Sequence, residues 1–337
     1  MNQPILLAYA VNRALRMITP EDARSLTHVN IAFGKVGRDG GMDSHELTDI
    51  EYTKTLKSWN PKLKFVVSVG GWGAGGFSAM AMTEKGRRDF ARSCAEYVFA
   101  HDLDGIDIDW EYPCSDSAGI DADPRDRENF TLLLQALRDA LGENKIVSIA
   151  AGAGAYFVRD TEMEKVAAIC DYVQLMTYDM RSGFCRQAGH HTSLYASKGD
   201  DSGRDTHSTV ELFHRSGVPL SKIVIGAAFY SRKWGGVPSE NNGLLQPAGT
   251  IGEYGPGYAE LVRSYIDKNG FKRYWDEDAR APYLFNGSQL ISYDDPDSVR
   301  EKCEYVKEKG LLGIMYWEHS CDDTHALLSA MAKALEK

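Results

Sequence analysis

Three carboxylates alternate with apolar residues in one short segment of the chain. Asp107, Asp109 and Glu111 are separated by Ile108 and Trp110. Successive side chains of a β-strand point to opposite faces, so the three carboxylates share one face and the apolar side chains share the other. Burying three carboxylates in a row is costly unless a site uses them. The alternation therefore predicts a strand that carries an acidic site.

Glu111 is the outermost member of this row, and we expect it at the C-terminal end of its strand. In β/α barrels this end carries the catalytic groups. Neighbouring carboxylates disfavour a further negative charge, so one of them should hold a proton near neutral pH. We assign the role of general acid to Glu111. Asp109 would exchange hydrogen bonds with Glu111 and with a substrate, and the deeper Asp107 would tune Asp109.

A divalent cation held by oxygen ligands is the alternative use of such a row. A strand spaces these groups along a line, and no other acidic cluster is obvious at the ends of the other strand candidates. We therefore predict no metal and no cofactor. We interpret the adjacent His190 and His191 as loop residues near the rim of the site, because neighbouring histidines on a loop seldom chelate one ion together.

The elements that would position these groups are eight short apolar runs separated by helical patterns. Most runs are continuously apolar, as expected for parallel strands covered on both sides. This alternation favours the α/β class and a closed (β/α)8 TIM barrel, with an open doubly wound sheet as the alternative. No G-x-G-x-x-G follows the first run, which weighs against the open sheet. The predicted strands are Pro4–Ala10, Thr27–Phe33, Leu63–Val69, Gly105–Trp110, Ile146–Ala151, Tyr172–Tyr178, Ile223–Tyr230 and Leu312–Trp317.

The interval between the seventh and eighth strands is too long for a single helix. It runs from Ser231 to about Tyr293 and is rich in Gly, Tyr and Trp. A structureless loop of this length would be unusual in a compact domain, so we predict a small α+β insertion at 231–293. Residues 1–230 and 294–337 would then form the barrel, which is the catalytic domain.

The bulk composition limits the class of protein. The 337 residues are 43% hydrophobic, and the net charge of -10 argues against a nucleic-acid partner. No apolar run approaches the roughly 18 residues that suggest a membrane span. The N-terminus lacks the features of a signal peptide, which predicts a cytoplasmic location, or an extracellular one if a signal was removed. Six scattered cysteines without C-x-x-C spacing favour free thiols.

Several segments resemble motifs of glycoside hydrolase family 18, the chitinase family. Asp104 opens a D-x-x-D-x-D-x-E pattern that ends at Glu111 and overlaps D-W-E-Y-P. Residues 68–72 resemble S-x-G-G-W, and residues 174–179 contain M-T-Y-D. Residues 229–232 and 313–318 resemble the ends of the seventh and eighth strands of the family. These motifs occur in order at predicted strand ends, and the resemblance covers nearly the whole chain.

The resemblance implies a chitinase that hydrolyses β-1,4 linkages between N-acetylglucosamine units by substrate-assisted, retaining catalysis. Glu111 would protonate the glycosidic oxygen, and the substrate's acetamido oxygen would attack the anomeric carbon to form an oxazolinium ion. Asp109 would accept a hydrogen bond from the acetamido N–H, and the hydroxyl of Tyr178 would donate one to the acetamido oxygen. The implied partner is chitin or chito-oligosaccharides, with no nucleic acid and no membrane, and we expect a monomer.

The resemblance also implies a set of sugar-binding residues. Trp317 would form the floor of the subsite that binds the distorted sugar, and Trp72 would stack on a sugar on the leaving-group side. Pyranose rings present apolar C–H faces that pack on aromatic rings. The other candidates are Tyr9, Phe33, Gly71, Tyr112, Met176, Asp179, Tyr230, Arg232 and, from the insertion, Trp275.

The chain departs from the family pattern at the first strand end, where Arg13 stands in place of a frequent Trp. This departure concerns the far non-reducing-side subsites and not the chemistry. No secretion signal or carbohydrate-binding module is recognised, so we expect a preference for soluble oligosaccharides over crystalline chitin. One alternative is a chitin-binding lectin on the same barrel, although such relatives typically replace the acidic Glu. The other is an endo-β-N-acetylglucosaminidase acting on N-glycans, against which D-W-E-Y-P and the large insertion speak.

Overall fold

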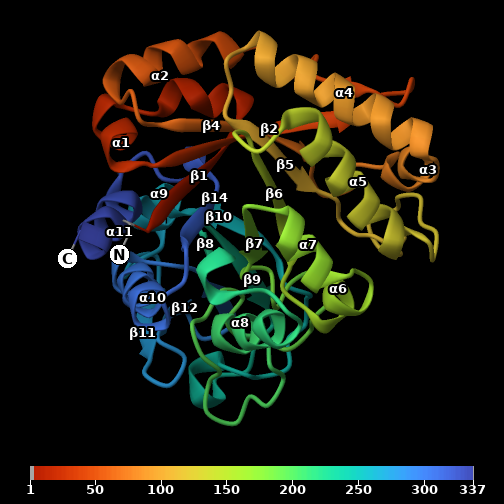
Figure 1. Ribbon diagram of the computed structural model, residues 1–337. Coiled ribbons are helices and arrows are strands. Elements are labelled where there is room, and N and C mark those ends of the chain that lie inside the picture. The colour runs from red at the N-terminus through yellow and green to blue at the C-terminus, as the bar shows by residue number, and fades with distance from the viewer. Residues whose placement is uncertain (1–3, 337) are drawn as a thin grey trace.

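Eight parallel strands close into a barrel in the computed structural model, which describes residues 4–336 (Figure 1). Their order is β1-β14-β8-β7-β6-β5-β4-β2, and β1 pairs with β2 to close the ring. The predicted (β/α)8 barrel is confirmed, with strand ends that differ by a few residues; positions 1–3 and 337 of the predicted barrel ranges lie outside the described residues. The barrel strands are β1 (Ile5–Val11), β2 (His28–Val36), β4 (Lys64–Gly70), β5 (Gly105–Asp109), β6 (Ile146–Gly152), β7 (Tyr172–Met176), β8 (Ile223–Ala228) and β14 (Gly313–Trp317).

Helices surround the strands on the outside of the barrel (Figure 1). Most barrel strands are followed by at least one helix before the next barrel strand begins, which is the alternation that the sequence predicts. The α-helices outside the insertion are α1 (Pro20–Ser25), α2 (Thr53–Trp59), α3 (Phe77–Ala81), α4 (Glu84–Ala100), α5 (Asp126–Leu141), α6 (Ala155–Arg159), α7 (Met163–Ile169), α8 (Thr206–Arg215), α10 (Pro296–Lys309) and α11 (Ala326–Glu336).

The two faces of β5 enter different environments, as its alternation predicts. Ile106, Ile108 and Trp110 are buried in the core between the strands and the helices. The Trp110 ring stacks on Phe77 of α3 with centroids 5.2 Å apart and meets the edge of Phe130 of α5 at 5.9 Å. This packing removes a large apolar surface from water and holds β5 against two helices. The carboxylates of the strand consequently face the barrel interior.

Helix α10 has strong start and stop signals in its sequence. Asp295 caps its first turn by accepting from the backbone N–H of Ser298, whose hydroxyl in turn accepts from the Asp295 N–H. Pro296 occupies the first helical position, and Gly310 ends the helix in the left-handed conformation. The helix follows the last strand of the insertion and precedes β14, so it connects the insertion back to the barrel.

A second sheet lies between β8 and β14 in the chain. Its five strands are antiparallel in the order β10-β9-β13-β12-β11, and Trp234, Tyr283, Phe285 and Leu290 pack in its own apolar cluster. The elements of this segment are β9 (Tyr230–Gly235), β10 (Glu253–Gly257), α9 (Tyr258–Ser264), β11 (Lys272–Asp276), β12 (Ala281–Phe285) and β13 (Gln289–Ser292). A short strand, β3 (Met42–Asp43), pairs separately with the end of β2.

The remaining sequence expectations concern membranes and thiols. None of the helices within residues 4–336 combines the length and the apolar character needed to cross a bilayer. All six cysteines are free thiols, and Cys94, Cys170 and Cys303 are buried. The prediction of unpaired cysteines is therefore confirmed.

Candidate active site

The three carboxylates of the acidic row lie at the C-terminal end of β5 and are all buried. Asp107 and Asp109 belong to the strand, and Glu111 follows two residues beyond its end. Their exposed fractions are 0% for Asp107, 4% for Asp109 and 8% for Glu111. Exposure thus increases toward the strand end, where a barrel enzyme binds its substrate.

Asp107 is the anchor of the row. Its Oδ2 accepts hydrogen bonds from Tyr9 Oη at 2.8 Å and Ser68 Oγ at 2.7 Å. Its Oδ1 accepts from Ser148 Oγ and Gln174 Nε2, each at 2.8 Å. Burial raises the pKa of Asp107, and these four hydrogen bonds oppose that rise. Residues from four other strands therefore hold one carboxyl in a fixed position beneath Asp109.

Asp109 has an oxygen without a partner. Its buried Oδ1 accepts no hydrogen bond from the residues that the structure describes. Burial raises the pKa of Asp109 well above the ordinary value, and the charges of Glu111 and Asp107 raise it further. The end of β4 approaches very closely here, because a Cβ at Gly70 would lie 1.9 Å from the Asp109 carbonyl oxygen, and Gly70 has φ +128°. A ligand N–H could satisfy the free oxygen.

Glu111 has the properties of a general acid. Burial raises its pKa from 4.5 to about 7, and the negative charge of Asp179 adds to the rise. A carboxyl with this pKa is partly protonated at neutral pH and can both give and take a proton. The proton on one member of the row stays a prediction, and the main cause of the raised pKa of Glu111 is burial rather than the neighbouring carboxylates of the row.

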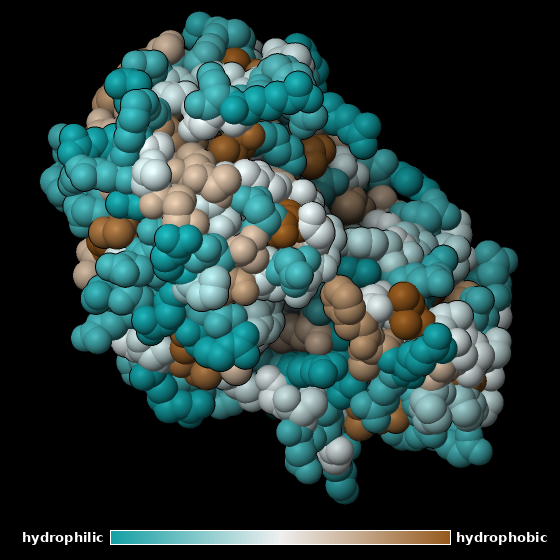
Figure 2. Space-filling view, turned by 90° about the vertical axis from the view of Figure 1, so that its right-hand side faces the viewer, coloured by the Kyte–Doolittle hydropathy of each residue, from teal (hydrophilic) through white to brown (hydrophobic). Residues whose placement is uncertain are grey.

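A cavity of about 970 Å³ opens above these carboxyls. The face of the molecule in Figure 2 is hollowed, and tan side chains lie beside teal ones in the hollow. Such a mixture of apolar surface and a few polar groups is typical of small-molecule sites. Predicted site residues that line the cavity are Tyr9, Phe33, Trp72, Asp109, Glu111, Tyr112, Met176, Tyr178, Asp179, Tyr230, Arg232 and Trp317.

Trp317 packs against two other aromatic side chains. Its ring stacks on Phe33 with centroids 5.5 Å apart and planes 21° apart, and Tyr9 approaches at 5.7 Å. Further along the cavity, the ring of Trp72, 53% exposed, meets Tyr112 at 6.1 Å. The aromatic surface therefore runs from the end of β14 across the end of β5.

Tyr178 lies at the end of β7 with its hydroxyl 3.8 Å from Met315 Sδ, a weak acceptor. Its ring packs against Tyr230 at 6.1 Å and against β8, where a Cβ at Gly226 would lie 2.8 Å from Tyr178 Cε1. The absence of a side chain at Gly226 thus allows the phenol to reach its position. The hydroxyl retains the capacity for a stronger acceptor than sulfur.

Asp179 joins strand β9 and the loop that contains His191 to the site. Arg232 binds both of its oxygens at 2.7 Å, and His191 Nδ1 lies 3.5 Å from Oδ1. Burial opposes ionisation of Asp179, but the hydrogen bonds to His191 and Arg232 lower its pKa well below the ordinary value. Asp179 therefore stays charged, and its charge acts on Glu111.

Three predicted residues lie outside the lining of the cavity. Asp107 lies one layer deeper, Gly71 backs the ring of Phe33, and the indole N–H of Trp275 points to Glu277 at 3.2 Å. His190 and His191 also differ from the interpretation as rim residues, because both are buried. Within residues 4–336, no three or more side chains of His, Cys, Asp or Glu are grouped so that they could hold a metal ion.

Sequence reasoning missed several aromatic residues of the site. Phe184 is 81% exposed and meets Trp72 at 6.4 Å, and Tyr156 meets Tyr112 at 5.1 Å. Tyr254 of the insertion stacks on the guanidinium of Arg232, with 3.6 Å between the ring centroid and Cζ. Phe184 lies on a loop, Tyr156 in the short helix α6 and Tyr254 in the insertion, where no period of a barrel strand marks the residues that face the barrel mouth.

A closed β/α barrel with a buried carboxyl of raised pKa at a strand end and an aromatic cleft fits the class of barrel enzymes that act on sugars. The family description that matches residues 6–322 is "Glycosyl hydrolases family 18". The chain belongs to this family.

Individual relatives match most of the chain. The solved structure of a glycoside hydrolase family 18 N-acetylglucosaminidase from Paenibacillus barengoltzii is 49% identical, with a TM-score of 0.96, and the match covers 98% of this chain and 99% of that chain. Chitinase A1 from Niallia circulans is 37% identical over 87% of this chain and 46% of its own length. Chitotriosidase-1 from Mus musculus is 32% identical over 90% of this chain and 68% of its own length. The chain thus spans about half the length of chitinase A1.

Proposed function

We propose that this chain is a chitinase that cleaves β-1,4 linkages between N-acetylglucosamine units. The observation that carries the proposal is the burial of Glu111 beside Asp109, in a cavity that Tyr178 and Trp317 also line. The chitinase relatives and the N-acetylglucosaminidase relative support the same class of substrate. Soluble chito-oligosaccharides are the proposed substrates.

The substrate's own acetamido group would supply the nucleophile. Glu111 gives its proton to the glycosidic oxygen while the acetamido oxygen attacks the anomeric carbon, which breaks the glycosidic bond and forms an oxazolinium ion. The unpartnered Oδ1 of Asp109 accepts the acetamido N–H, and the hydroxyl of Tyr178 donates to the acetamido oxygen. Glu111 then takes a proton from water, which opens the ring with retained configuration. Acid–base help of this kind contributes about 10²–10⁴-fold in rate.

Release of single units from chain ends is a second candidate. The Paenibacillus relative, which matches nearly the full length of both chains, is described as an N-acetylglucosaminidase. On the side where the leaving group would bind, beside Trp72 and Tyr112, the lining of the cavity also includes Tyr156, whose ring packs against Tyr112. Within the described residues, no part of 12–17 after β1 lines it. A cleft that is longer on the leaving-group side suits a chain that enters by its non-reducing end.

Chromogenic glycosides distinguish these functions. The substrates are aryl glycosides of N-acetylglucosamine, its β-1,4 dimer and its trimer, with aryl cellobioside as the matched compound without acetamido groups. We expect turnover of the dimer or trimer glycoside and none of the cellobioside, with the Glu111→Gln variant as the blank. Turnover of the monomer glycoside alone would favour the second candidate.

Two outcomes would contradict the proposal. Turnover of the cellobioside as fast as that of the N-acetylglucosamine dimer glycoside would show that the acetamido group has no role in the reaction. Tight binding of chito-oligosaccharides without any turnover would indicate a lectin, and release of glycans from a high-mannose glycoprotein alone would indicate an endo-β-N-acetylglucosaminidase.

A further inference from the structure

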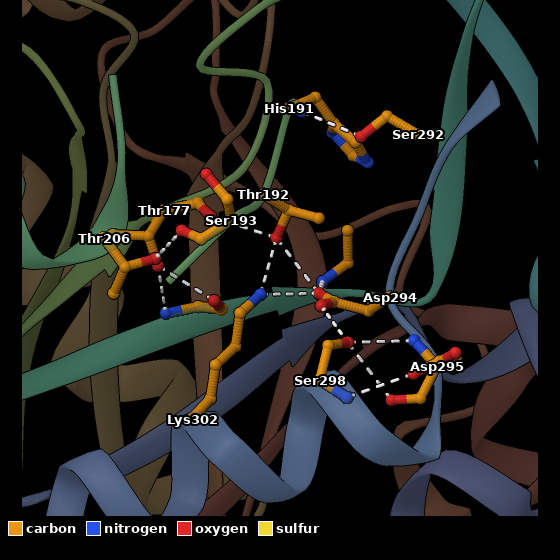
Figure 3. A network of polar contacts seen from close by, with 12 residues as sticks. Thr177, His191, Thr192, Ser193, Thr206, Ser292, Asp294, Asp295, Ser298 and Lys302 are labelled. Atoms are coloured by element: carbon orange, nitrogen blue, oxygen red, sulfur yellow. Dashed lines mark hydrogen bonds and ion pairs between the residues drawn. The ribbon is translucent and has the colours of Figure 1, made fainter. Parts of the chain in front are cut away.

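Lys302 and Asp294 form an ion pair that is completely buried beneath α10 (Figure 3). The Nζ of Lys302 lies 2.7 Å from Oδ2 of Asp294, and both side chains are shielded from solvent. The same Nζ donates to Thr192 Oγ1 at 2.8 Å. Burial lowers the pKa of Lys302, and the adjacent Asp294 charge opposes this. Neither Lys302 nor Asp294 lines the cavity, so the mechanism above leaves them without a role.

Asp294 connects this pair to the end of β8. Its Oδ2 accepts the backbone N–H of Ala228 at 2.9 Å, and its Oδ1 accepts the hydroxyl of Ser298 at 2.7 Å. Ala228 is the last residue of β8 and lies opposite Trp317 of β14 in the sheet register. The carboxylate therefore binds the barrel strand that separates Tyr178 from Trp317.

Thr192 connects the pair to the end of β7. Its Oγ1 lies 3.2 Å from the carbonyl oxygen of Thr177 and 3.0 Å from Asp294 Oδ2 (Figure 3). Thr177 directly precedes Tyr178, and its own hydroxyl bonds to both the N–H and the carbonyl of Gly226 on β8 at 2.8 Å. The ends of β7 and β8 are thus joined to each other and to Lys302.

The segment around Thr192 is held on both sides. His191 donates its backbone N–H to Ser292 Oγ at 2.9 Å, and its carbonyl accepts from Met180 at 3.1 Å. Ser193 accepts two hydrogen bonds from Thr206 at the start of α8. The loop that follows Tyr178 is therefore hydrogen-bonded to the insertion and to α8 on either side of its contact with the ion pair.

Stability alone does not explain a buried ion pair. Removing two charges from water costs several kcal/mol per ion, and apolar replacements of the pair are often neutral or stabilising. A hydrogen-bonded ion pair does, however, fix the directions of its partners more strictly than apolar packing does. Such an ion pair is useful at a strand end that carries a catalytic group, because the orientation of that group toward the substrate must be fixed.

We propose that Lys302 and Asp294 are positioning residues, which set the ends of β7 and β8 so that Tyr178 lies at the correct distance from the acetamido group. The inference rests on the proposed function. Catalytic geometry is sensitive, since a misplacement of about 1 Å can cost about 10²-fold in rate. The ion pair acts through Thr192 on Tyr178 and through Ala228 on β8, without touching the substrate.

The opposite end of the barrel contains a comparable ion pair that serves as a control, although the side chain of its aspartate, Asp171, is 42% exposed. Arg138 of α5 binds Asp171 Oδ2 at 2.6 Å, and the same oxygen accepts the backbone N–H of Val147 at 2.9 Å. Here too a helix cation pairs with an aspartate that holds a strand N–H. Asp171 precedes β7 and Val147 is the second residue of β6, so this pair binds the strand ends that are remote from the site.

The test compares Lys302→Met, Thr192→Val and Arg138→Met in the full chain. Thr192→Val leaves both charges in place and removes the hydroxyl that contacts Lys302, Asp294 and the carbonyl of Thr177, so it serves if Lys302→Met does not fold. A double variant, Lys302→Met with Asp294→Asn, removes both charges and keeps an acceptor for Ala228. The readouts are Tm, and kcat and KM on the aryl chitobioside well below Tm.

We expect kcat to fall at least about tenfold in Lys302→Met and about threefold or more in Thr192→Val, with smaller changes in KM. The double variant should recover much of the lost Tm and keep the low kcat. Arg138→Met should lower Tm and leave kcat within about twofold of the wild type. A folded Lys302→Met or Thr192→Val with wild-type kcat would overturn the inference, as would an equal loss of kcat in Arg138→Met. Wild-type protein without turnover would instead refute the proposed function.

Discussion

At the scale of single residues, the environment divides the roles of three similar carboxyls. Four hydrogen bonds saturate Asp107, whereas Asp109 keeps one free oxygen and Glu111 has its pKa raised to about 7. Environments that push the pKa values of neighbouring acids apart are the usual basis for assigning acid and base roles. Glu111 is the member that can exchange a proton with the substrate near neutral pH.

Replacing Glu111 with Gln should separate binding from catalysis. The amide cannot protonate a leaving group, so we expect kcat to fall at least about 10²-fold. Binding of a chito-oligosaccharide, measured by titration calorimetry, should stay within about tenfold of the wild type, because the aromatic floor is unchanged. Turnover close to the wild-type rate would refute the assignment of the acid.

Replacing Asp179 with Asn should shift the pH profile. The charge of Asp179 raises the pKa of Glu111, so its removal, which leaves Arg232 unpaired, lowers that pKa. Glu111 must be protonated to act as the acid, and the alkaline limb of kcat/KM should therefore move to lower pH. The check is kcat/KM from about pH 4 to 9. A limb that stays in place or moves to higher pH would count against the coupling.

At the scale of elements, the strand ends decide where the catalytic groups lie. Tyr178 reaches its place because Gly226 on β8 leaves room for its ring. A methyl group at Gly226 would lie 2.8 Å from Tyr178 Cε1 and 2.9 Å from the Leu175 carbonyl oxygen. The close approach of β7 and β8 is thus part of the active site.

Replacing Gly226 with Ala should displace Tyr178. We expect kcat to fall at least about tenfold and the free energy of unfolding to fall by about 1–3 kcal/mol, because the core is overpacked. Gly235→Ala on β9 is the matched control. A Cβ at Gly235 would lie 3.6 Å from its nearest atom, Thr250 Cγ2, which is an ordinary van der Waals contact. Kinetics and urea denaturation would measure both effects. Similar losses in the two variants would show that the close contact with Tyr178 is unimportant.

The elements also show what the sequence could predict. Continuous apolar runs marked the barrel strands, and the strict alternation of β5 predicted which side chains face inward. The order of the strands in the insertion could not be predicted from the sequence, because β9 pairs with β13, which lies far along the chain. The buried roles of His190, His191 and Lys302 were equally hidden. Each depends on partners from distant segments, as in the contact of Lys302 with Thr192.

At the scale of the whole molecule, the site lowers the stability of the fold in the pH range where Glu111 ionises. A carboxyl that is buried and partly protonated is less easily ionised in the folded state than in the unfolded chain. For Glu111 the pKa is about 7 in the folded state against an ordinary 4.5. The folded state therefore binds more protons between these values, and stability falls as pH rises through them.

The Glu111→Gln variant should thus be more stable than the wild type at alkaline pH. Its amide stays neutral, so the wild type should lose about 3 kcal/mol relative to the variant between pH 4.5 and 8. Thermal unfolding of both proteins at several pH values measures the difference. Glu143→Gln, at an exposed position after α5, is the control and should follow the wild type. Parallel curves for wild type and Glu111→Gln would show that Glu111 ionises freely.

The stereochemistry of cleavage tests the central claim most directly. Proton NMR in the first minutes of hydrolysis of an N-acetylglucosamine tetramer reports which anomer of the new reducing end forms first. Attack by the acetamido oxygen followed by water, with Glu111 as acid and then base, predicts the β-anomer before mutarotation. Initial formation of the α-anomer would mean direct attack by water, and the roles given to Asp109 and Tyr178 would be wrong.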